Sequence, residues 1–359
     1  MRYVLNIFFL LALSSFAKAQ VNVELLKISL DSVLSENNIN DPGGSVHIEQ
    51  GNQIIYSKSF GLADIKTKEK FSEYTVSNIG GISKTFIAYS ILILQKQGKF
   101  SIEDPISLYF SDFNNKEIAS SVKIKHLMMH TSGFIDLPLS KKDSLVSLKI
   151  SDTQNFESLK HVNKLAFEPG SNFAYSDKAY SGLVLIIEKV SNLKFHEFVK
   201  QNILTPSGMS FTKVTENDFP NEKVAHAYLK LKKKYKEYDK GECPKMETIS
   251  SAGIWTNIVD LRKYMYALKY NLFLDSLNIK LSEQFSSPMQ GNYLNSNSHG
   301  LCWFANHANN IEYSSNQCAF SSTIIFFQEK DLTLICLSNN HKNYSQIILN
   351  QLKYFKIIQ

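Results

Sequence analysis

The sequence has few residues of the kinds that build metal centres, redox motifs or membrane spans. Its 359 residues include four cysteines, and none of them forms a Cys-x-x-Cys pair. The nine histidines show no His-Glu-x-x-His pattern or other ligand spacing. Beyond the first twenty residues, no apolar run is long enough to span a bilayer. These absences predict a protein with no metal, no cofactor and no transmembrane span after processing.

The first residues have the layout of a secretory signal peptide. Arg2 precedes the apolar run from Val4 to Phe16, and Ala17-Lys18-Ala19 forms an A-x-A cleavage site. We therefore expect residues 1–19 to be removed from an exported protein, either periplasmic or secreted. Loss of Arg2 and Lys18 lowers the net charge from +6 to +4. So mild a charge gives no reason to expect nucleic acid as a partner.

An exported chain can form disulfides, so the cysteines allow two interpretations. The spacing between Cys302 and Cys318 fits a bridge between neighbouring strands. The favoured interpretation is that Cys243, Cys302, Cys318 and Cys336 are small, buried, apolar residues on strands.

Hydrophobic periodicity places strands near both ends of the chain and helices between them. Two runs around Gly51-Asn52 predict a hairpin, and an apolar helix begins near Gly81 and stops at Gly98. Helices are predicted over 21–39 and 343–357, and late strands over 299–304, 311–315, 322–328 and 332–338. The pattern predicts an α+β fold, with an antiparallel sheet flanked by N- and C-terminal helices and an inserted, mainly helical lobe.

We expect a single domain over 20–359. Its sheet lobe covers about 20–75 and 290–359, and its helical lobe covers about 76–289. No internal repeat or low-complexity linker interrupts it. A lysine-rich stretch over 228–236 alternates like an exposed hairpin. Its favoured interpretation is a solvated face, and the functional alternative is a contact for an anionic envelope polymer.

The segment from Val76 to Ala88 contains Gly81-Ile82-Ser83-Lys84. It resembles the active-site helix of the serine β-lactamase-like family, which includes class C β-lactamases, D-alanyl-D-alanine carboxypeptidases and related esterases and aminopeptidases. The family signature there is Ser-x-x-Lys, a nucleophile followed one helical turn later by a lysine. Lys84 matches the lysine. The nucleophile position holds Gly81, so an acyl-enzyme cannot form there.

Other segments extend the resemblance over residues 24–357 in the family's order. They include a Gly-x-Ala-Asp turn, an "H-T-S-G" turn, a "P-G-x-x-F-x-Y-S" element and a "P-x-G-M" turn, at 61–64, 130–133, 169–176 and 206–209. The resemblance implies that His130 and Ser132 have a structural role in a turn. Two other serines, Ser77 and Ser83, are not expected to replace the nucleophile. Ser83 lies about 200° round a helix from Gly81, and Ser77 precedes the helix.

The family's second motif, Tyr-x-Asn, corresponds to Tyr175-Ser176-Asp177. The resemblance implies that Tyr175 occupies the place of a proton-transfer tyrosine. Asp177 replaces the asparagine that orients substrate and lysine. A carboxylate beside Lys84 favours the charged ammonium, which is the wrong state for a general base.

The third motif, Lys-Thr-Gly or His-x-Gly, is missing. Counting back without gaps from Ala319-Phe320-Ser321-Ser322 places Tyr313-Ser314-Ser315 at this position. Neither family version of the motif lies anywhere in 305–325. All three catalytic motifs are therefore altered together.

These changes predict a cleft that binds a ligand without turning it over. Its expected ligand is a small molecule, a peptide or a cell-wall fragment, bound partly by free amides at the start of the Gly81 helix. One alternative is an active hydrolase that uses a non-standard nucleophile or a water activated by Tyr175. Another is a structural envelope protein whose cleft is filled by the protein's own side chains and binds no ligand. The predicted site consists of Gly81, Lys84, Tyr175, Asp177, Tyr313, Ser315 and Asn316.

Overall fold

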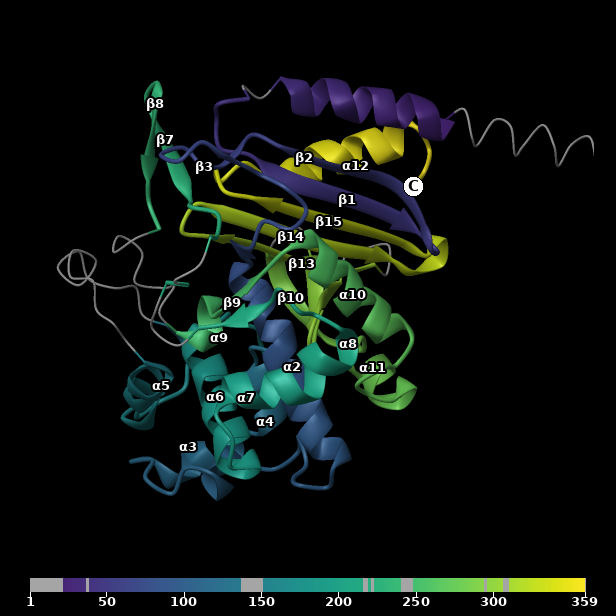
Figure 1. Cartoon of the computed structure of the whole chain (residues 1–359). Coiled ribbons are helices and arrows are strands. Elements are labelled where there is room, and N and C mark those ends of the chain that lie inside the picture. The colour runs from purple at the N-terminus through teal and green to yellow at the C-terminus, as the bar shows by residue number, and fades with distance from the viewer. Residues whose placement is uncertain are drawn as a thin grey trace, which may run out of the picture.

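The computed structural model describes most of the chain (Figure 1). The described residues are 22–36, 39–136, 151–215, 219–220, 223–239, 248–293, 296–305 and 310–358. The expected signal peptide lies outside them. Of the helices described, none has the length and apolar character needed to cross a membrane.

The main sheet of the described residues has eight antiparallel strands in the order β10-β11-β12-β13-β14-β15-β1-β2. They are β1 (Gly44–Gln50), β2 (Gln53–Phe60), β10 (Phe285–Tyr293), β11 (Ser296–Gly300), β12 (Phe304–Ala305), β13 (Ile311–Gln317), β14 (Phe320–Phe327) and β15 (Leu332–Ser338). Because β1 pairs with β15, the two ends of the chain meet inside one sheet. The predicted antiparallel sheet is therefore confirmed, with a break at 301–303 in the strand expected over 299–304.

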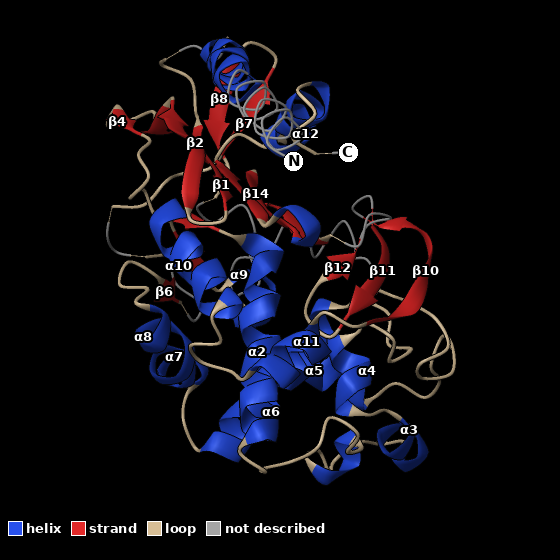
Figure 2. Cartoon of the chain, turned by 90° about the vertical axis from the view of Figure 1, so that its right-hand side faces the viewer, coloured by secondary structure: helices blue, strands red, loops and turns tan. Residues whose placement is uncertain are grey.

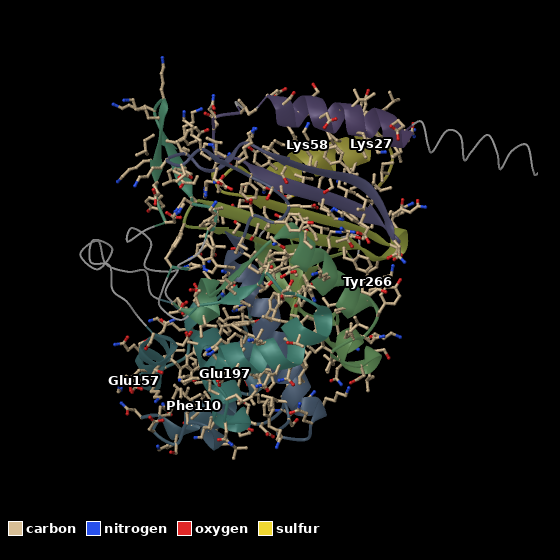
Figure 3. The ribbon with its side chains drawn as sticks, viewed as in Figure 1. Lys27, Lys58, Phe110, Glu157, Glu197 and Tyr266 are labelled. Carbon is tan, nitrogen blue, oxygen red and sulfur yellow. The ribbon has the colours of Figure 1, made fainter. Side chains whose placement is uncertain are left out.

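Two helices from opposite ends of the chain cover one face of this sheet (Figure 1). The first spans 22–35, and the second is α12 (Tyr344–Tyr354). Leucines at every fourth position of the first helix pack with Ile348 and Leu352 of α12 in one buried cluster. Lys58 of β2 also donates to Asp31 of the first helix at 2.6 Å (Figure 3).

The helical lobe lies on the other face of the sheet, below β1, β2 and β14 in Figure 2. Its helices are α2 (Ser83–Lys96), α3 (Lys116–Ser121), α4 (Ile124–Met128), α5 (Asp152–Lys160), α6 (Asp177–Ser191), α7 (Phe195–Val199), α8 (Thr205–Ser207), α9 (Ile249–Ala252), α10 (Ile258–Lys269) and α11 (Ser276–Ser282). Shorter turns are the 3-10 helices η1 (Gly80–Ile82), η2 (Ile106–Leu108) and η5 (Gln328–Lys330), and the π-helix η3 (Lys200–Leu204).

Helix α2 runs through the middle of this lobe. All its residues from Ser83 to Leu94 are buried, which explains why most of this stretch is apolar. Gly98, with a φ of 69°, takes the left-handed conformation that ends the helix, as predicted. The helix expected to begin at Gly81 instead begins with the η1 turn, which sets the position of Gly81 relative to the sheet.

Among the described residues, short strands form three small sheets, β3-β4, β5-β9-β6 and β7-β8, besides the main one. They are β3 (Leu62–Asp64), β4 (Glu69–Lys70), β5 (Ser77–Asn78), β6 (Lys213–Val214), β7 (Tyr228–Leu231), β8 (Lys234–Glu237) and β9 (Ile254–Thr256). The predicted lysine-rich hairpin is β7–β8, which projects from the molecule in Figure 1. Most of its side chains are exposed or half-buried, which agrees with a solvated face.

The cysteines are not all alike. Cys302 and Cys336 are free and buried, as the favoured interpretation expects, but Cys302 lies in the break at 301–303 whereas Cys336 lies on β15. Cys318 is disulfide-bonded, so it is not a simple apolar core residue. Because Cys302 is free, a Cys302–Cys318 bridge is wrong. Cys243 lies outside the described residues.

Candidate functional site

Gly81 lies in the η1 turn between the sheet and α2. A Cβ atom added to it would lie 3.1 Å from Tyr313 Cε1, 3.3 Å from Ser315 Oγ and 3.4 Å from Tyr175 Oη. A side chain at this position would therefore project between the second-motif tyrosine and strand β13. The structure brings together the residues that the sequence assigned to the first, second and third motifs. Residue 81 itself supplies no hydroxyl group to this arrangement.

The backbone amides at the start of this helix are already used. Gly81 N–H donates to Ser315 Oγ at 2.8 Å, and Gly80 N–H donates to Asn78 Oδ1 at 2.8 Å. Ile82 N–H donates to Ile79 O at 3.2 Å. The expectation of free amides for an anion is therefore wrong. Short polar side chains from β5 and β13 satisfy the amides of Gly80 and Gly81.

Gly80 and Gly81 should respond differently to substitution. Gly80 has a φ of 51°, and an added Cβ would lie 2.4 Å from Ser315 Oγ. We expect Gly80→Ala to lower the free energy of unfolding by roughly 2 kcal/mol or more, because strain adds to the clash. Gly81→Ala requires its neighbours to shift by only a few tenths of an ångström and should cost under about 1 kcal/mol. Urea unfolding of both variants measures the difference, and equal losses would contradict this geometry.

Lys84 is fully buried and forms an ion pair. Its Nζ lies 2.6 Å from Asp177 Oδ1 and 2.9 Å from Ser250 O. The same nitrogen lies 5.1 Å and 5.4 Å from the ring centroids of Tyr175 and Tyr180. A carboxylate, a carbonyl and two ring faces all stabilise the ammonium form. These contacts favour the ammonium form of Lys84, which is the wrong state for a general base.

Two carboxylates, the half-buried Asp136 and the buried Asp152, hold the partners of Lys84 in place, and neither was predicted from the sequence. Asp136 accepts hydrogen bonds from Asp177 N and Ser176 Oγ, both at 2.7 Å, at the start of α6. Asp152 accepts from Ser250 N at 3.3 Å at the start of α9. Burial raises the pKa of both Asp136 and Asp152, while hydrogen bonds to the carboxylates oppose the rise. Helix N-termini are favourable places for such groups.

His130 packs against the ring of Tyr175. Their rings stack with centroids 4.4 Å apart, and His130 Nδ1 accepts from Ser176 N at 3.1 Å. Burial, with His299 and Lys84 nearby, holds the pKa of His130 well below its usual value, so the ring is neutral. Ser132 is buried and accepts from Phe134 N at 3.3 Å. Both residues lie in a turn, in keeping with the structural role expected for them.

The two serines considered as substitutes are fully buried. Ser83 Oγ accepts from Ile254 N at 3.2 Å, and Ser77 lies in β5 opposite Thr256. Neither hydroxyl is open to a substrate, which agrees with their exclusion on sequence grounds.

Strand β13 presents alternate residues to the site. Tyr313, Ser315 and Gln317 lie against η1, as the contacts of the added Cβ atoms show. Ser314 lies on the other face and donates to Thr323. Asn316 alternates to that same face and is exposed, so its place in the predicted site is wrong. Gln317, which the sequence analysis missed, takes that place because side chains alternate along a strand.

The structure also has a hollow of about 360 Å³ on the helical-lobe side of the sheet. It lies near Ile311 at the start of β13, whereas Gly81 lies against Tyr313 and Ser315 further along that strand. Its lining includes Arg262 and Tyr266 of α10, and Tyr266 is labelled in Figure 3. Its charged groups are largely paired, since Arg262 donates to Glu49 at 2.9 Å and Lys269 to Asp331 at 2.6 Å. None of the predicted site residues lines it.

Comparison with known proteins identifies the family. The family model described as "Beta-lactamase" matches residues 35–350, which is well over half of the chain. The chain belongs to the beta-lactamase family. This assignment confirms the resemblance drawn from the motifs.

Two relatives from bacteria match much of this beta-lactamase family member. Penicillin-binding protein 4* of Bacillus subtilis (strain 168) is 26% identical over 324 residues, covering 85% of this chain and 70% of the relative. Protein flp of Staphylococcus aureus (strain NCTC 8325 / PS 47) is 25% identical over 343 residues, covering 87% of this chain and 66% of the relative. The chain thus spans about two thirds of the length of these relatives.

A solved structure supports the fold. The octameric penicillin-binding protein homologue from Pyrococcus abyssi superposes with a TM-score of 0.76 at 22% identity, covering 92% of this chain and 76% of that chain. At this level of identity the likeness shows the fold alone. It confirms the predicted α+β architecture.

Proposed function

We propose that this protein is an exported, non-catalytic member of the beta-lactamase family that binds a peptide or cell-wall-type ligand in its cleft. The observation that carries the proposal is the position of Gly81. Tyr313, Ser315 and Tyr175 converge on the point where its missing side chain would begin. Loss of a serine nucleophile costs on the order of 10⁶ in turnover in a well-studied serine protease.

The general base and the oxyanion donors that acyl transfer requires are altered as well. Acyl transfer needs a base for the nucleophile and amide donors for the oxyanion. Lys84 pairs with Asp177, so it cannot act as the base. The Gly81 amide donates to Ser315 Oγ rather than into an open site. These three changes support binding in place of turnover.

The partly exposed groups of the site favour a ligand with N–H donors. The Asp177 side chain is 22% exposed, and Tyr175 and Ser315 are half-buried beside it. A carboxylate accepts hydrogen bonds from amide or ammonium groups, which peptides and cell-wall peptides carry. The export part of the proposal rests on the signal-like sequence of residues 1–19.

A second candidate function is a hydrolase with a displaced nucleophile. Ser315 Oγ lies 3.3 Å from the position of the missing Gly81 Cβ, so its hydroxyl stands close to the place of a serine side chain. Against this candidate, the nearby Lys84 is engaged by Asp177 and Ser250. The displaced nucleophile would therefore lack the family's base.

Binding of a peptide and its cleavage can be measured in the same sample. A pentapeptide ending in D-alanyl-D-alanine is incubated with protein spanning 20–359, while ligand-observed NMR follows both binding and cleavage. The peptide should bind and remain intact. Tyr175→Phe should weaken binding about three- to tenfold by removing one hydrogen-bonding group, and Asn316→Ala, on the opposite face, should change nothing. Cleavage by the unaltered protein would support the displaced nucleophile, and absence of binding would refute this ligand class.

A further inference from the structure

A cluster of metal-type ligands lies outside the site around Gly81, at the base of the β7–β8 hairpin. His226 precedes β7, Glu237 ends β8 and Asp239 follows it. We propose that these three residues form a binding site for a divalent transition-metal ion, with zinc as the best match. The sequence predicted no metal, because the three ligands follow no familiar spacing and come together only when the hairpin closes.

The distances within the cluster suit a shared ion. His226 Nδ1 lies 3.3 Å from Glu237 Oε1 and 3.2 Å from Asp239 Oδ2, and the three ligand atoms lie within 4.8 Å of one another. Zinc binds nitrogen and carboxylate oxygen at about 2.0–2.2 Å, so two ligands at a tetrahedral angle are roughly 3.4 Å apart. The observed separations are close to this value.

The buried carboxylate of Asp239 is a separate indication of a cation. Its side chain is completely buried, and its Oδ2 accepts a hydrogen bond from Ala227 N at 2.9 Å. Its other oxygen, Oδ1, is buried without a hydrogen-bond partner among the described residues. Buried carboxylate oxygens normally have a partner, because an unsatisfied one carries its full desolvation cost. A cation bound by both oxygens of Asp239 would give Oδ1 a partner.

An ordinary ion pair accounts less well for this arrangement. His226 Nδ1 faces oxygens from two different carboxylates, whereas an imidazole nitrogen can donate at most one proton. One positive charge would also leave a net negative charge at a site where Asp239 is buried. A divalent ion balances both carboxylates and takes a lone pair from a neutral imidazole. One nitrogen and two oxygens are donors that zinc accepts readily.

The surroundings indicate a structural clamp. His226 N–H donates to Ala63 O at 2.9 Å, and His226 O accepts from Asn339 Nδ2 at 2.8 Å, which ties this residue to β3 and to the end of β15. The His226 ring stacks on Phe219 with centroids 5.1 Å apart, which fixes its direction. An ion bound here would join both ends of the hairpin to the body of the protein, so its loss should lower stability.

Zinc binding to tag-free, chelator-treated protein tests the proposal. We expect about one zinc ion per chain by elemental analysis after dialysis, and a melting temperature raised by a few degrees. Mg²⁺ and Ca²⁺, which prefer larger sets of oxygen ligands, should give no such shift. His226→Ala and the milder Glu237→Gln should each lower zinc affinity at least about tenfold. His161→Ala is the matched control, because that exposed histidine also pairs with a glutamate.

The variants are compared first without zinc, so that any loss of folding is seen separately by circular dichroism. Folded Glu237→Gln protein that has lost the zinc-dependent shift supports the site. Unaltered protein that retains no zinc overturns the proposal. Zinc bound equally by the wild type and Glu237→Gln also overturns it, since the ion would then lie elsewhere.

Discussion

Gly81→Ser alone should leave the protein nearly unreactive toward penicillin, whereas Gly81→Ser combined with Asp177→Asn should be acylated at least about 10²-fold faster. The first change supplies the hydroxyl, and the space around Gly81 admits it with small shifts of Tyr313 and Ser315. The second removes the carboxylate that lies 2.6 Å from Lys84 Nζ and favours its ammonium form. General-base catalysis contributes typically about 10²–10⁴-fold, which sets the expected ratio.

Stopped incubations followed by intact mass spectrometry give the acylation rate of each variant. Asp177→Asn without the serine is the control, because it changes Lys84 but provides no hydroxyl at position 81. Equal rates for the single and double variants would show that the Lys84–Asp177 pair is not the barrier. The low reactivity would then be attributed to the Gly81 amide, which donates its hydrogen bond to Ser315 Oγ.

Lys84→Met and Asp177→Ala should each destabilise the fold by about 3 kcal/mol or more. Removal of one partner of a buried ion pair leaves an uncompensated charge, and such changes typically cost about 3–5 kcal/mol. Lys84 is completely buried, so Asp177→Ala leaves its ammonium with Ser250 O and two aromatic rings. Because the Asp177 side chain is 22% exposed, Lys84→Met should be the milder of the two changes.

The double variant completes a thermodynamic cycle measured by urea unfolding. We expect it to be more stable than the sum of the single losses implies, with a coupling of about 1–3 kcal/mol. The exposed pair of Lys27 and Glu24, 2.8 Å apart, is the matched control and should show a coupling below about 1 kcal/mol. Additive losses at Lys84 and Asp177 would mean that the two residues do not act as a pair.

Much of the architecture could be predicted, because alternation and helical spacing are local signals. The β1–β2 hairpin around Gly51-Asn52, the late strands and the end of α2 at Gly98 all follow from turn residues and hydrophobic periodicity. The resemblance also placed Tyr313 and Ser315 beside Gly81, by counting back without gaps from Ala319-Phe320-Ser321-Ser322. These predictions needed no knowledge of distant contacts.

The hydrogen bonds of the site could not be predicted, because they join side chains and amides that come together only after folding. Nothing near Ser315 in the sequence indicates that its hydroxyl accepts from the Gly81 amide, 234 residues earlier in the chain. Asp136 and Asp152 act through backbone amides of α6 and α9. Asn316 was misplaced because one residue along a strand reverses the face. The cluster around His226 likewise depends on pairing in the β7–β8 hairpin.

The central claim is that the cleft binds without forming a covalent intermediate. Its most direct test is intact mass spectrometry of the unaltered protein after incubation with penicillin and with an activated ester, beside a Ser315→Ala variant. We predict no increase in mass for either protein with either reagent. A stable acyl adduct on the unaltered protein would contradict the claim, and its loss in Ser315→Ala would identify Ser315 as a displaced nucleophile.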